Sequence, residues 1–144
     1  MKCLSIRMPG VVGKGSKNTF LPRTIENILN NKPVSVYGFN NYFNNVVCVE
    51  TLSQYLLEWP TKYSNNKCSM FNICSSHPVT LKNVCIILMN RLGVKTKIIE
   101  NNKGKKPFTI DFTMAKNNGF PVIPTEDSLI KYANIFNKYL ERSV

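Results

Sequence analysis

The segment Ser5–Ser16 contains the residues whose types and spacing first suggest chemistry. Its glycines, lysine and serine are the residue types that surround phosphate groups in nucleotide-binding loops. The Walker pattern requires four residues between its glycines and a Ser or Thr directly after the Lys. Here two residues separate Gly10 from Gly13, and another glycine follows Lys14. The dinucleotide pattern G-x-G-x-x-G fails as well, so neither phosphate-binding motif is present.

The other residue types that act in catalysis or bind metals are scattered. His77 is the only histidine and precedes a proline, so we interpret it as a surface turn residue. The two aspartates, Asp111 and Asp127, lie far apart, and the glutamates form no obvious catalytic pair. We therefore expect no self-sufficient catalytic site, no histidine triad and no metal site.

Five cysteines without a C-x-x-C pair predict reduced core thiols in a cytosolic protein. They are Cys3, Cys48, Cys68, Cys74 and Cys85.

Expected strands alternate with expected helices, which predicts an α/β fold. Leu4, Ile6 and Met8 alternate with polar residues and predict a buried first strand that ends at Pro9-Gly10. Further strands are expected at 34–37, 46–49, 70–74 and 96–100, with loops at 39–45 and 61–67, a turn at 75–78 and a short extended piece at 108–112. Helices are expected to begin at Thr19, Glu50, Thr80 and Thr125, with a one-turn helix at 113–118. Pro60 and Gly93 are expected to end the second and third of them.

Length and composition predict a single globular domain over residues 1–144. The net charge of +11 raises the possibility of nucleic-acid binding. However, the basic residues do not cluster beyond the loop 103–106, which favours a solvated basic surface. With no apolar run of membrane-spanning length and no signal peptide, the sequence predicts a cytoplasmic protein without membrane contact.

A succession of short motifs is more informative than any one of them. The motifs are Arg7-x-Pro9-Gly10-Val11-Val12-Gly13, Asn18–Pro22, Pro33–Gly38, Asn44–Glu50, Phe71-Asn72-Ile73, Thr80-Leu81 and Asp111–Phe120. In this order and spacing they resemble the C-terminal half of the extended short-chain dehydrogenases/reductases, the NAD-dependent epimerase/dehydratase family that acts on nucleotide-activated sugars. The resemblance covers about the whole chain.

This resemblance implies that the chain is the substrate-binding part of such a fold and lacks the N-terminal Rossmann half. In the family that half binds NAD or NADP and carries a Tyr-x-x-x-Lys pair, whose tyrosine is the acid/base. Tyr63 and Lys67 have this spacing, but they fall in an expected polar loop, so we assign no catalytic residue.

The resemblance also implies two sets of ligand-contacting residues. The cofactor-binding set, beside the nicotinamide and the sugar, is Pro9, Gly10 and Val11. The substrate-binding set is Asn18, Thr19, Phe20, Val36, Tyr37 and Asn44. The first three of these would hold the diphosphate, partly through N–H groups at a helix N-terminus. Val36 and Tyr37 would flank the nucleotide base; an ordinary strand aromatic is the alternative interpretation of Tyr37.

Two positions depart from the family pattern. Many relatives have Asn where Gly10 stands, and Arg then Asp where Asn44 and Asn45 stand. That Arg clamps the diphosphate, and Asn44 cannot replace its charge or its bidentate geometry. The candidate sources of the missing positive charge are Lys14, Arg23 and Lys105.

Two functional hypotheses follow. In the first, the chain is the substrate-binding half of an NAD(P)-dependent nucleotide-sugar epimerase, dehydratase or reductase of surface-polysaccharide or sugar-nucleotide metabolism. It would be inactive alone and would join a separately encoded Rossmann half or a second copy of itself. In the second, it is a non-catalytic module that binds an anion or nucleic acid, or a decayed enzyme remnant.

Overall fold

A computed structural model describes residues 3–62, 68–104 and 108–140, the last three by their backbone alone. The elements in chain order are β1 (Cys3–Arg7), β2 (Gly10–Val12), α1 (Phe20–Leu29), β3 (Val34–Tyr37), β4 (Tyr42–Phe43), β5 (Val46–Cys48), α2 (Val49–Lys62), β6 (Cys68–Asn72), β7 (Val79–Thr80), α3 (Leu81–Leu92), β8 (Ile98–Asn101), α4 (Thr113–Asn117) and α5 (Thr125–Leu140). Helices and strands alternate, which confirms the α/β prediction.

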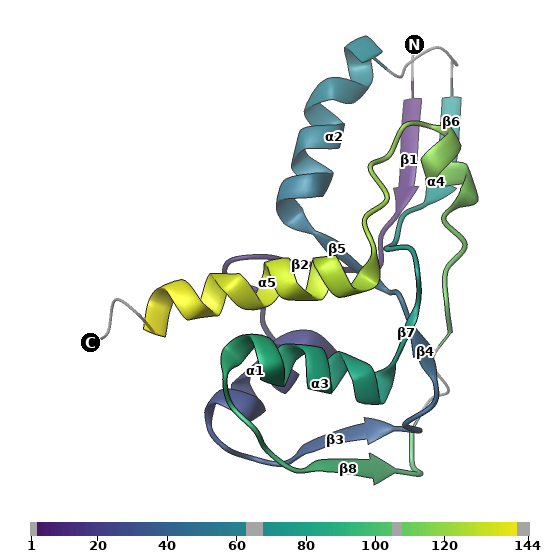
Figure 1. The fold of residues 1–144 in the computed structure, drawn as a ribbon. Coiled ribbons are helices and arrows are strands. Elements are labelled where there is room, and N and C mark those ends of the chain that lie inside the picture. The colour runs from purple at the N-terminus through teal and green to yellow at the C-terminus, as the bar shows by residue number, and fades with distance from the viewer. Residues whose placement is uncertain (1–2, 63–67, 105–107, 141–144) are drawn as a thin grey trace.

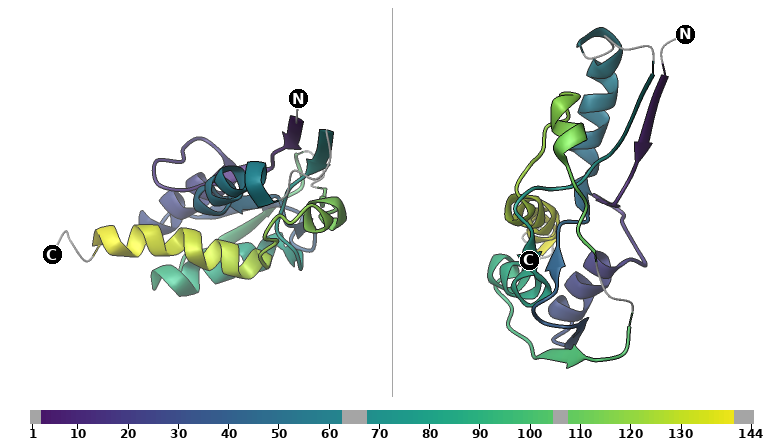
Figure 2. Two further views of the ribbon diagram at one scale, coloured as in Figure 1. Left: turned by 90° about the horizontal axis from the view of Figure 1, so that it is seen from above. Right: turned by 90° about the vertical axis from the view of Figure 1, so that its right-hand side faces the viewer.

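The described strands form four separate two-stranded ladders (Figure 1). Three are parallel and join β1 to β6, β2 to β5, and β3 to β8; β4 and β7 pair antiparallel. The molecule is elongated, with β1, β6 and α2 at one end and β3 and β8 at the other. Helices α3 and α5 lie side by side between these ends, as the two further views also show (Figure 2).

Two hydrophobic cores meet at β5. Val46 and Cys48 belong to the larger core, which α1, α3, α5 and β3 share. Val47 belongs to the smaller core, with residues of α2, β6 and α4. Since successive side chains of a strand point to opposite faces, one short apolar strand serves both cores.

The first strand is half-buried, which corrects the prediction of a buried strand. Leu4 and Ile6 pack partly against the smaller core, whereas Met8 lies beyond the end of β1 and is 63% exposed. The reason is that β1 pairs only with β6 among the described strands, so its other edge has no strand beside it. Gly10, expected to end the first strand, instead begins β2.

The predicted helix starts are confirmed for three helices. Thr80 caps α3, because its Oγ1 accepts a hydrogen bond from the Asn83 N–H at 3.3 Å. Gly93 ends α3 with a φ of 69°, a left-handed conformation that glycine adopts without steric cost. Thr19 precedes α1 and Thr125 begins α5, as expected.

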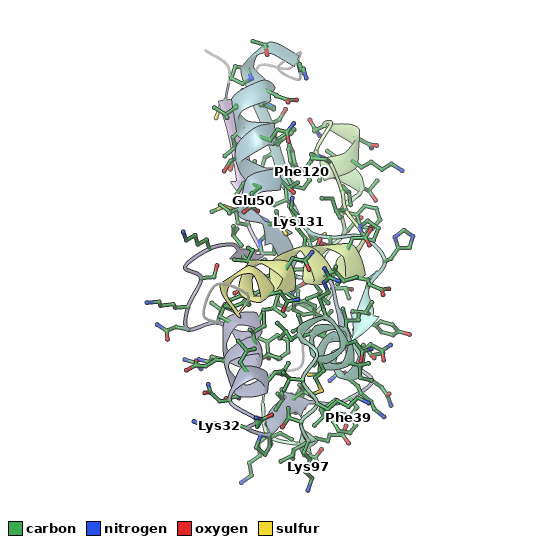
Figure 3. The ribbon with its side chains drawn as sticks, turned by 60° about the vertical axis from the view of Figure 1, so that its left-hand side comes forward. Lys32, Phe39, Glu50, Lys97, Phe120 and Lys131 are labelled. Atoms are coloured by element: carbon green, nitrogen blue, oxygen red, sulfur yellow. The ribbon has the colours of Figure 1, made fainter. Side chains whose placement is uncertain are left out.

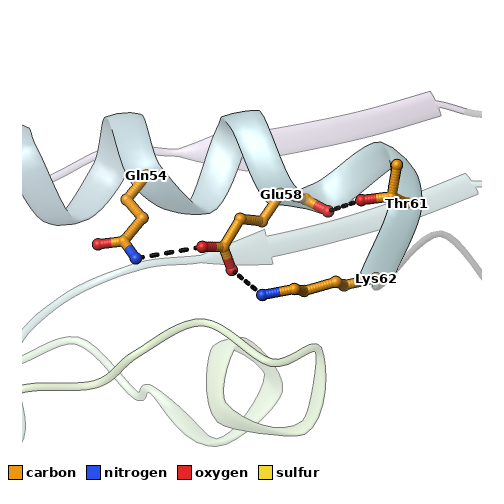
Figure 4. Close-up of polar contacts among 4 residues, drawn as sticks. All are labelled: Gln54, Glu58, Thr61 and Lys62. Carbon is orange, nitrogen blue, oxygen red and sulfur yellow. Dashed lines mark hydrogen bonds and ion pairs between the residues drawn. The ribbon is translucent and has the colours of Figure 1, made fainter.

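Helix α2 continues past Pro60, which corrects the predicted end. Its last turn is held by a polar network centred on Glu58 (Figure 4). Gln54 Nε2 and Lys62 Nζ donate to the Glu58 carboxylate at 3.1 and 2.9 Å, and Thr61 Oγ1 donates to Glu58 O at 3.1 Å. The hydrogen bond from Lys62 lowers the pKa of Glu58. These contacts help the helix to tolerate a residue without an N–H.

Smaller corrections concern strand boundaries. The predicted strand at 70–74 begins two residues earlier as β6, and its Met70 is 64% exposed. The strand expected at 96–100 runs from Ile98 to Asn101. The expected loop at 39–45 contains β4, and 108–112 belongs to no strand. Residues 63–67 of the expected polar loop lie outside the described residues.

The expectation of core thiols holds for three of the five cysteines. Cys48, Cys74 and Cys85 are buried, whereas Cys3 and Cys68 are exposed; all are free thiols. Over the described ranges, no helix has the length and apolar character needed to cross a membrane.

Candidate functional site

The loop between β2 and α1 is built around a close approach of Gly13 to α2. A Cβ on Gly13 would overlap the Val49 side chain, so only glycine fits this position. The loop then turns on itself: the Gly13 N–H donates to Ser16 Oγ at 2.9 Å, and the Ser16 N–H donates to Gly13 O at 3.2 Å. These contacts make a packed turn, in agreement with the failure of both phosphate-loop motifs.

Three expected diphosphate contacts lie at the N-terminus of α1. Asn18 and Thr19 are exposed, and Asn18 has a left-handed φ of 63°. Thr19 is extended at the N-cap, and within the described part of the chain its side chain makes no capping hydrogen bond. First-turn N–H groups that Thr19 leaves uncapped carry the partial positive charge that attracts anions. Phe20 is half-buried against the larger core.

A hollow of about 450 Å³ runs from the loop before this helix along α1 to Asn30. Lys17 and Asn18 line it from the loop, Glu26 from α1 and Phe136 from α5. Lys17 thus lies near the expected diphosphate position. Sequence analysis did not select it, because it belongs to none of the recognised motifs.

A second hollow, of about 320 Å³, lies at the end of β3 and is lined by Tyr37, Gly38, Asn41 and Asn102. Asn41 Nδ2 donates to Tyr37 O at 2.9 Å and thereby fixes the turn after β3. The backbone at Gly104 covers part of the Tyr37 ring, since a Cβ there would lie 3.1 Å from Tyr37 Cδ2. Tyr37 is therefore half-buried, with the hollow beside it.

Sequence reasoning missed Asn41 and Asn102. Asparagine is abundant in this chain, so neither residue stood out. Asn102 reaches the hollow only because Tyr37 pairs with Asn101 in the β3–β8 ladder. This pairing joins segments that are distant in the sequence, and no local sequence pattern predicts it.

The three expected cofactor contacts lie at the start of β2. Pro9 directly precedes this strand, and Gly10 and Val11 are its first two residues. The Gly10 N–H donates to Asn45 O at 3.3 Å, where β2 pairs with β5. Gly10 is exposed, while Pro9 and Val11 are half-buried. They offer backbone and apolar surface, with no charged side chain among them.

The remaining two expected substrate residues are buried. Val36 is 2% exposed and its side chain belongs to the larger core, so only its backbone can face a ligand. Asn44 is 1% exposed, and its amide hydrogen bonds to the backbone of Ser75 and Ile110. We therefore leave the Asn44 side chain out of the ligand-contacting set.

A ring contact joins the start of α1 to β4. Phe20, at the start of α1, meets Phe43 of β4 edge to face, with centroids 5.7 Å apart. Phe43 follows the turn that contains Gly38 and Asn41. The helix N-terminus and the turn after Tyr37 are thus joined by direct packing.

Of the three proposed sources of positive charge, Lys14 and Arg23 are exposed and lie on either side of the α1 start. Lys105 lies outside the described residues. Two further lysines, Lys32 and Lys97, lie at the end of the molecule that carries β3 and β8, whereas Glu50 and Lys131 lie nearer its middle (Figure 3).

Two further side chains with potential chemistry, Cys48 and His77, line neither of the two hollows. Burial raises the pKa of the Cys48 thiol; Lys131 opposes this shift and Glu50 adds to it (Figure 3). His77 is exposed in the turn before β7, as predicted, and its Nδ1 lies 3.0 Å from Ser76 Oγ. In the described part of the chain, no three metal-ligating side chains come together.

Comparison with solved structures identifies the fold. A UDP-glucose 4-epimerase with UDP-glucose from Thermotoga maritima matches with a TM-score of 0.71 and 22% identity, over 95% of this chain and 46% of that chain. The chain has the fold of the C-terminal half of an extended short-chain dehydrogenase/reductase. No family model and no curated protein sequence matches it.

Other proteins with the extended short-chain dehydrogenase/reductase fold match equally well. A dTDP-glucose 4,6-dehydratase from Bacillus anthracis in complex with NAD has a TM-score of 0.71 and 17% identity, over 94% of this chain and 44% of that chain. A dTDP-4-dehydrorhamnose reductase from Yersinia enterocolitica has a TM-score of 0.68 and 16% identity, over 92% and 49%. The chain spans about half the length of the solved structures it matches.

Proposed function

We propose that this chain is the substrate-binding half of an NAD(P)-dependent enzyme that epimerises, dehydrates or reduces a nucleotide sugar. The observation that carries the proposal is the match of nearly the whole chain to about half of such enzymes. The catalytic tyrosine and most of the cofactor site would then come from a Rossmann half, encoded separately or in the same chain. Surface-polysaccharide or sugar-nucleotide metabolism is the proposed setting, in the cytoplasm.

The proposed substrate position uses both hollows. The diphosphate lies against the N-terminus of α1, near Asn18 and Thr19, with Lys17 as a nearby cation. The base lies beside Tyr37, where Asn41 and Asn102 offer amide groups that can donate and accept hydrogen bonds. Direct packing of Phe20 on Phe43 joins the two regions.

The proposed cofactor contact is limited to Pro9, Gly10 and Val11. Their exposed backbone and apolar surface suit the face of a nicotinamide ring, and a Cβ on Gly10 would crowd Asn45 O at 3.1 Å. When bound, NAD(P) supplies hydride transfer. These residues would only pack against the ring, since none of the three has a titratable side chain.

A binding and turnover experiment tests this proposal. The chain is titrated with UDP-glucose, dTDP-glucose, UDP and glucose 1-phosphate, and binding is followed by amide chemical-shift changes. We expect shifts at Asn18, Thr19 and Tyr37 with the nucleotide-containing ligands, and none with glucose 1-phosphate. With NAD and a nucleotide sugar, the chain alone should form no product.

Two outcomes would contradict the proposal. Turnover by this chain alone would show that the catalytic groups are present after all. Binding to RNA that weakens steeply with salt, together with no shifts from any nucleotide sugar, would favour the anion-binding alternative that the charge of +11 suggests.

A further inference from the structure

Cys3 and Cys68 are direct partners in the β1–β6 ladder. Each is the first residue of its strand, and the parallel register pairs Cys3 with Cys68. Both are exposed free thiols. The two cysteines lie far apart in the sequence, and only the ladder brings them together.

Their side chains lie on the same face of the ladder. Exposure alternates along both strands: Cys3 and Ser5 are exposed on β1, Cys68 and Met70 on β6, while Phe71 points into the smaller core. Neighbouring strands lie about 4.8 Å apart. This spacing falls within the range of about 4.4–6.8 Å between the Cα atoms of disulfide-bonded cysteines.

The other three thiols are less able to form a disulfide. Cys48, Cys74 and Cys85 are buried. Burial raises the pKa of Cys74 to about 11 and that of Cys85 to about 12. Since the thiolate is the attacking species, these buried thiols react slowly at neutral pH, whereas the exposed pair is accessible to an oxidant.

We propose that Cys3 and Cys68 form a reversible disulfide that ties β1 to β6 under oxidising conditions. With glutathione disulfide as oxidant, one thiolate attacks it, forms a mixed disulfide and releases one glutathione. The second thiolate then attacks the protein sulfur of that mixed disulfide and releases the second glutathione. The two protein thiols lose two protons and two electrons in total, and these reduce one glutathione disulfide to two glutathione molecules.

This proposal is independent of the proposed function and concerns a modification site at the opposite end of β1 from Pro9. The closed ring contains β2, α1, β3, β4, β5 and α2, so the bond limits the freedom of most of the first half of the chain after unfolding. Both cysteines stand at the start of their strands, so a small adjustment of the sulfur positions disturbs only the end of the ladder.

Oxidation of the purified chain by a graded glutathione disulfide/glutathione buffer tests the proposal. We expect a mass loss of two hydrogens and, after proteolysis without reductant, a single peptide pair joined through Cys3 and Cys68. The thermal midpoint should rise by several degrees, and dithiothreitol should reverse both changes. Cys68→Ser should abolish the mass loss and the midpoint shift.

A relocated thiol is the matched control. The double variant Cys3→Ser/Ser5→Cys keeps a thiol on the same face but opposite Met70, two residues further along. This places it roughly 8 Å from Cys68, beyond disulfide range, so the intrachain bond should be lost. Separate glutathione adducts on Cys3 and Cys68, or links only between two chains, would overturn the proposal.

Discussion

The Asn44 amide and the backbone of Ile110 exchange two hydrogen bonds. Asn44 Nδ2 donates to Ile110 O at 2.8 Å, and the Ile110 N–H donates to Asn44 Oδ1 at 2.9 Å. The same Nδ2 donates to Ser75 O at 3.0 Å. A buried side chain between β4 and β5 thus joins this connection to two segments that form no ladder with it, in the way a neighbouring strand would.

Replacing Asn44 should therefore destabilise the fold. Asn44→Ala leaves the Ile110 N–H and two carbonyl oxygens without this partner, and we expect a loss of about 2–4 kcal/mol in the free energy of unfolding. Urea denaturation measures it. Asn45→Ala is the control, because Asn45 Oδ1 is buried with no hydrogen-bond partner among the described residues, and it should cost less than about 1 kcal/mol. Equal losses in both variants would contradict the prediction that the hydrogen bonds of the Asn44 side chain stabilise the fold.

Sequence reasoning selected Asn44 by resemblance as a substrate-binding residue but could not reveal the backbone contacts of its side chain. A resemblance assigns a role to a position in the chain, but here that position carries an uncharged, short side chain where many relatives in the family have an arginine. Its role depends on Ile110, which lies 66 residues away. By contrast, Thr80 and Gly93 were predicted correctly as helix ends, because capping depends on the residue itself and its near neighbours.

The close approach of Gly13 to Val49 predicts a strong response to one methyl group. Gly13→Ala places a Cβ on Val49 Cγ1 and should cost about 1–3 kcal/mol of unfolding free energy. Val49→Ala removes the nearest obstructing atom, Cγ1, but keeps the Cβ at position 49, which would lie 3.2 Å from the new methyl carbon. In a double-mutant cycle, the Gly13→Ala penalty should be smaller in the Val49→Ala background; an unchanged penalty would mean that the contact with the Val49 side chain does not cause the loss.

If the base of a nucleotide sugar lies beside Tyr37, then Tyr37→Ala should weaken binding about 10-fold or more, through lost ring contact. Tyr42→Ala is matched in chemistry, since Tyr42 is 59% exposed and does not line the hollow. Calorimetric titration with UDP-glucose should find the affinity of Tyr42→Ala unchanged. Tyr37 is an ordinary strand aromatic if both variants bind as the unmodified chain does.

The charge of Lys17 should matter only for ligands that carry phosphate. Lys17→Gln should weaken UDP binding several-fold at low salt, and the difference should shrink as salt is added, because exposed charges are screened. Lys116→Gln removes an equally exposed charge from α4 and should change nothing. A salt-independent effect of Lys17→Gln would point to lost packing instead of lost charge.

Burial of the Cys85 thiol should make stability fall at alkaline pH. Its pKa is raised from 9.0 to about 12, so the unfolded chain loses this proton first. The contribution is complete below about pH 9 and is lost progressively as the pH rises toward 12, at up to about 1.4 kcal/mol per pH unit. Urea midpoints from pH 8 to 11 should therefore fall less steeply for Cys85→Ala than for Cys68→Ala, which replaces an exposed thiol.

The boundaries of the strands were the least predictable part of the fold. Gly10 looked like the end of a strand, yet its N–H begins a second ladder against Asn45. Pro60 looked like the end of a helix, yet Glu58 and its partners support another turn. In both cases a neighbouring group provides a stabilising contact that compensates for an unfavourable local propensity, and the sequence alone does not identify that group.

The ladders also set an order of events during protein synthesis. Gly10 pairs with Val46, Cys3 with Cys68 and Val34 with Ile98. Strands β1, β2 and β3 can therefore find their partners only after a later stretch of the chain has left the ribosome. Such long-range pairing slows folding and leaves apolar strands exposed in the meantime. A growing chain that stalled before Ile98 would hold a finished β3 with nothing to pair against, which makes this interval the one in which chaperone protection would matter most.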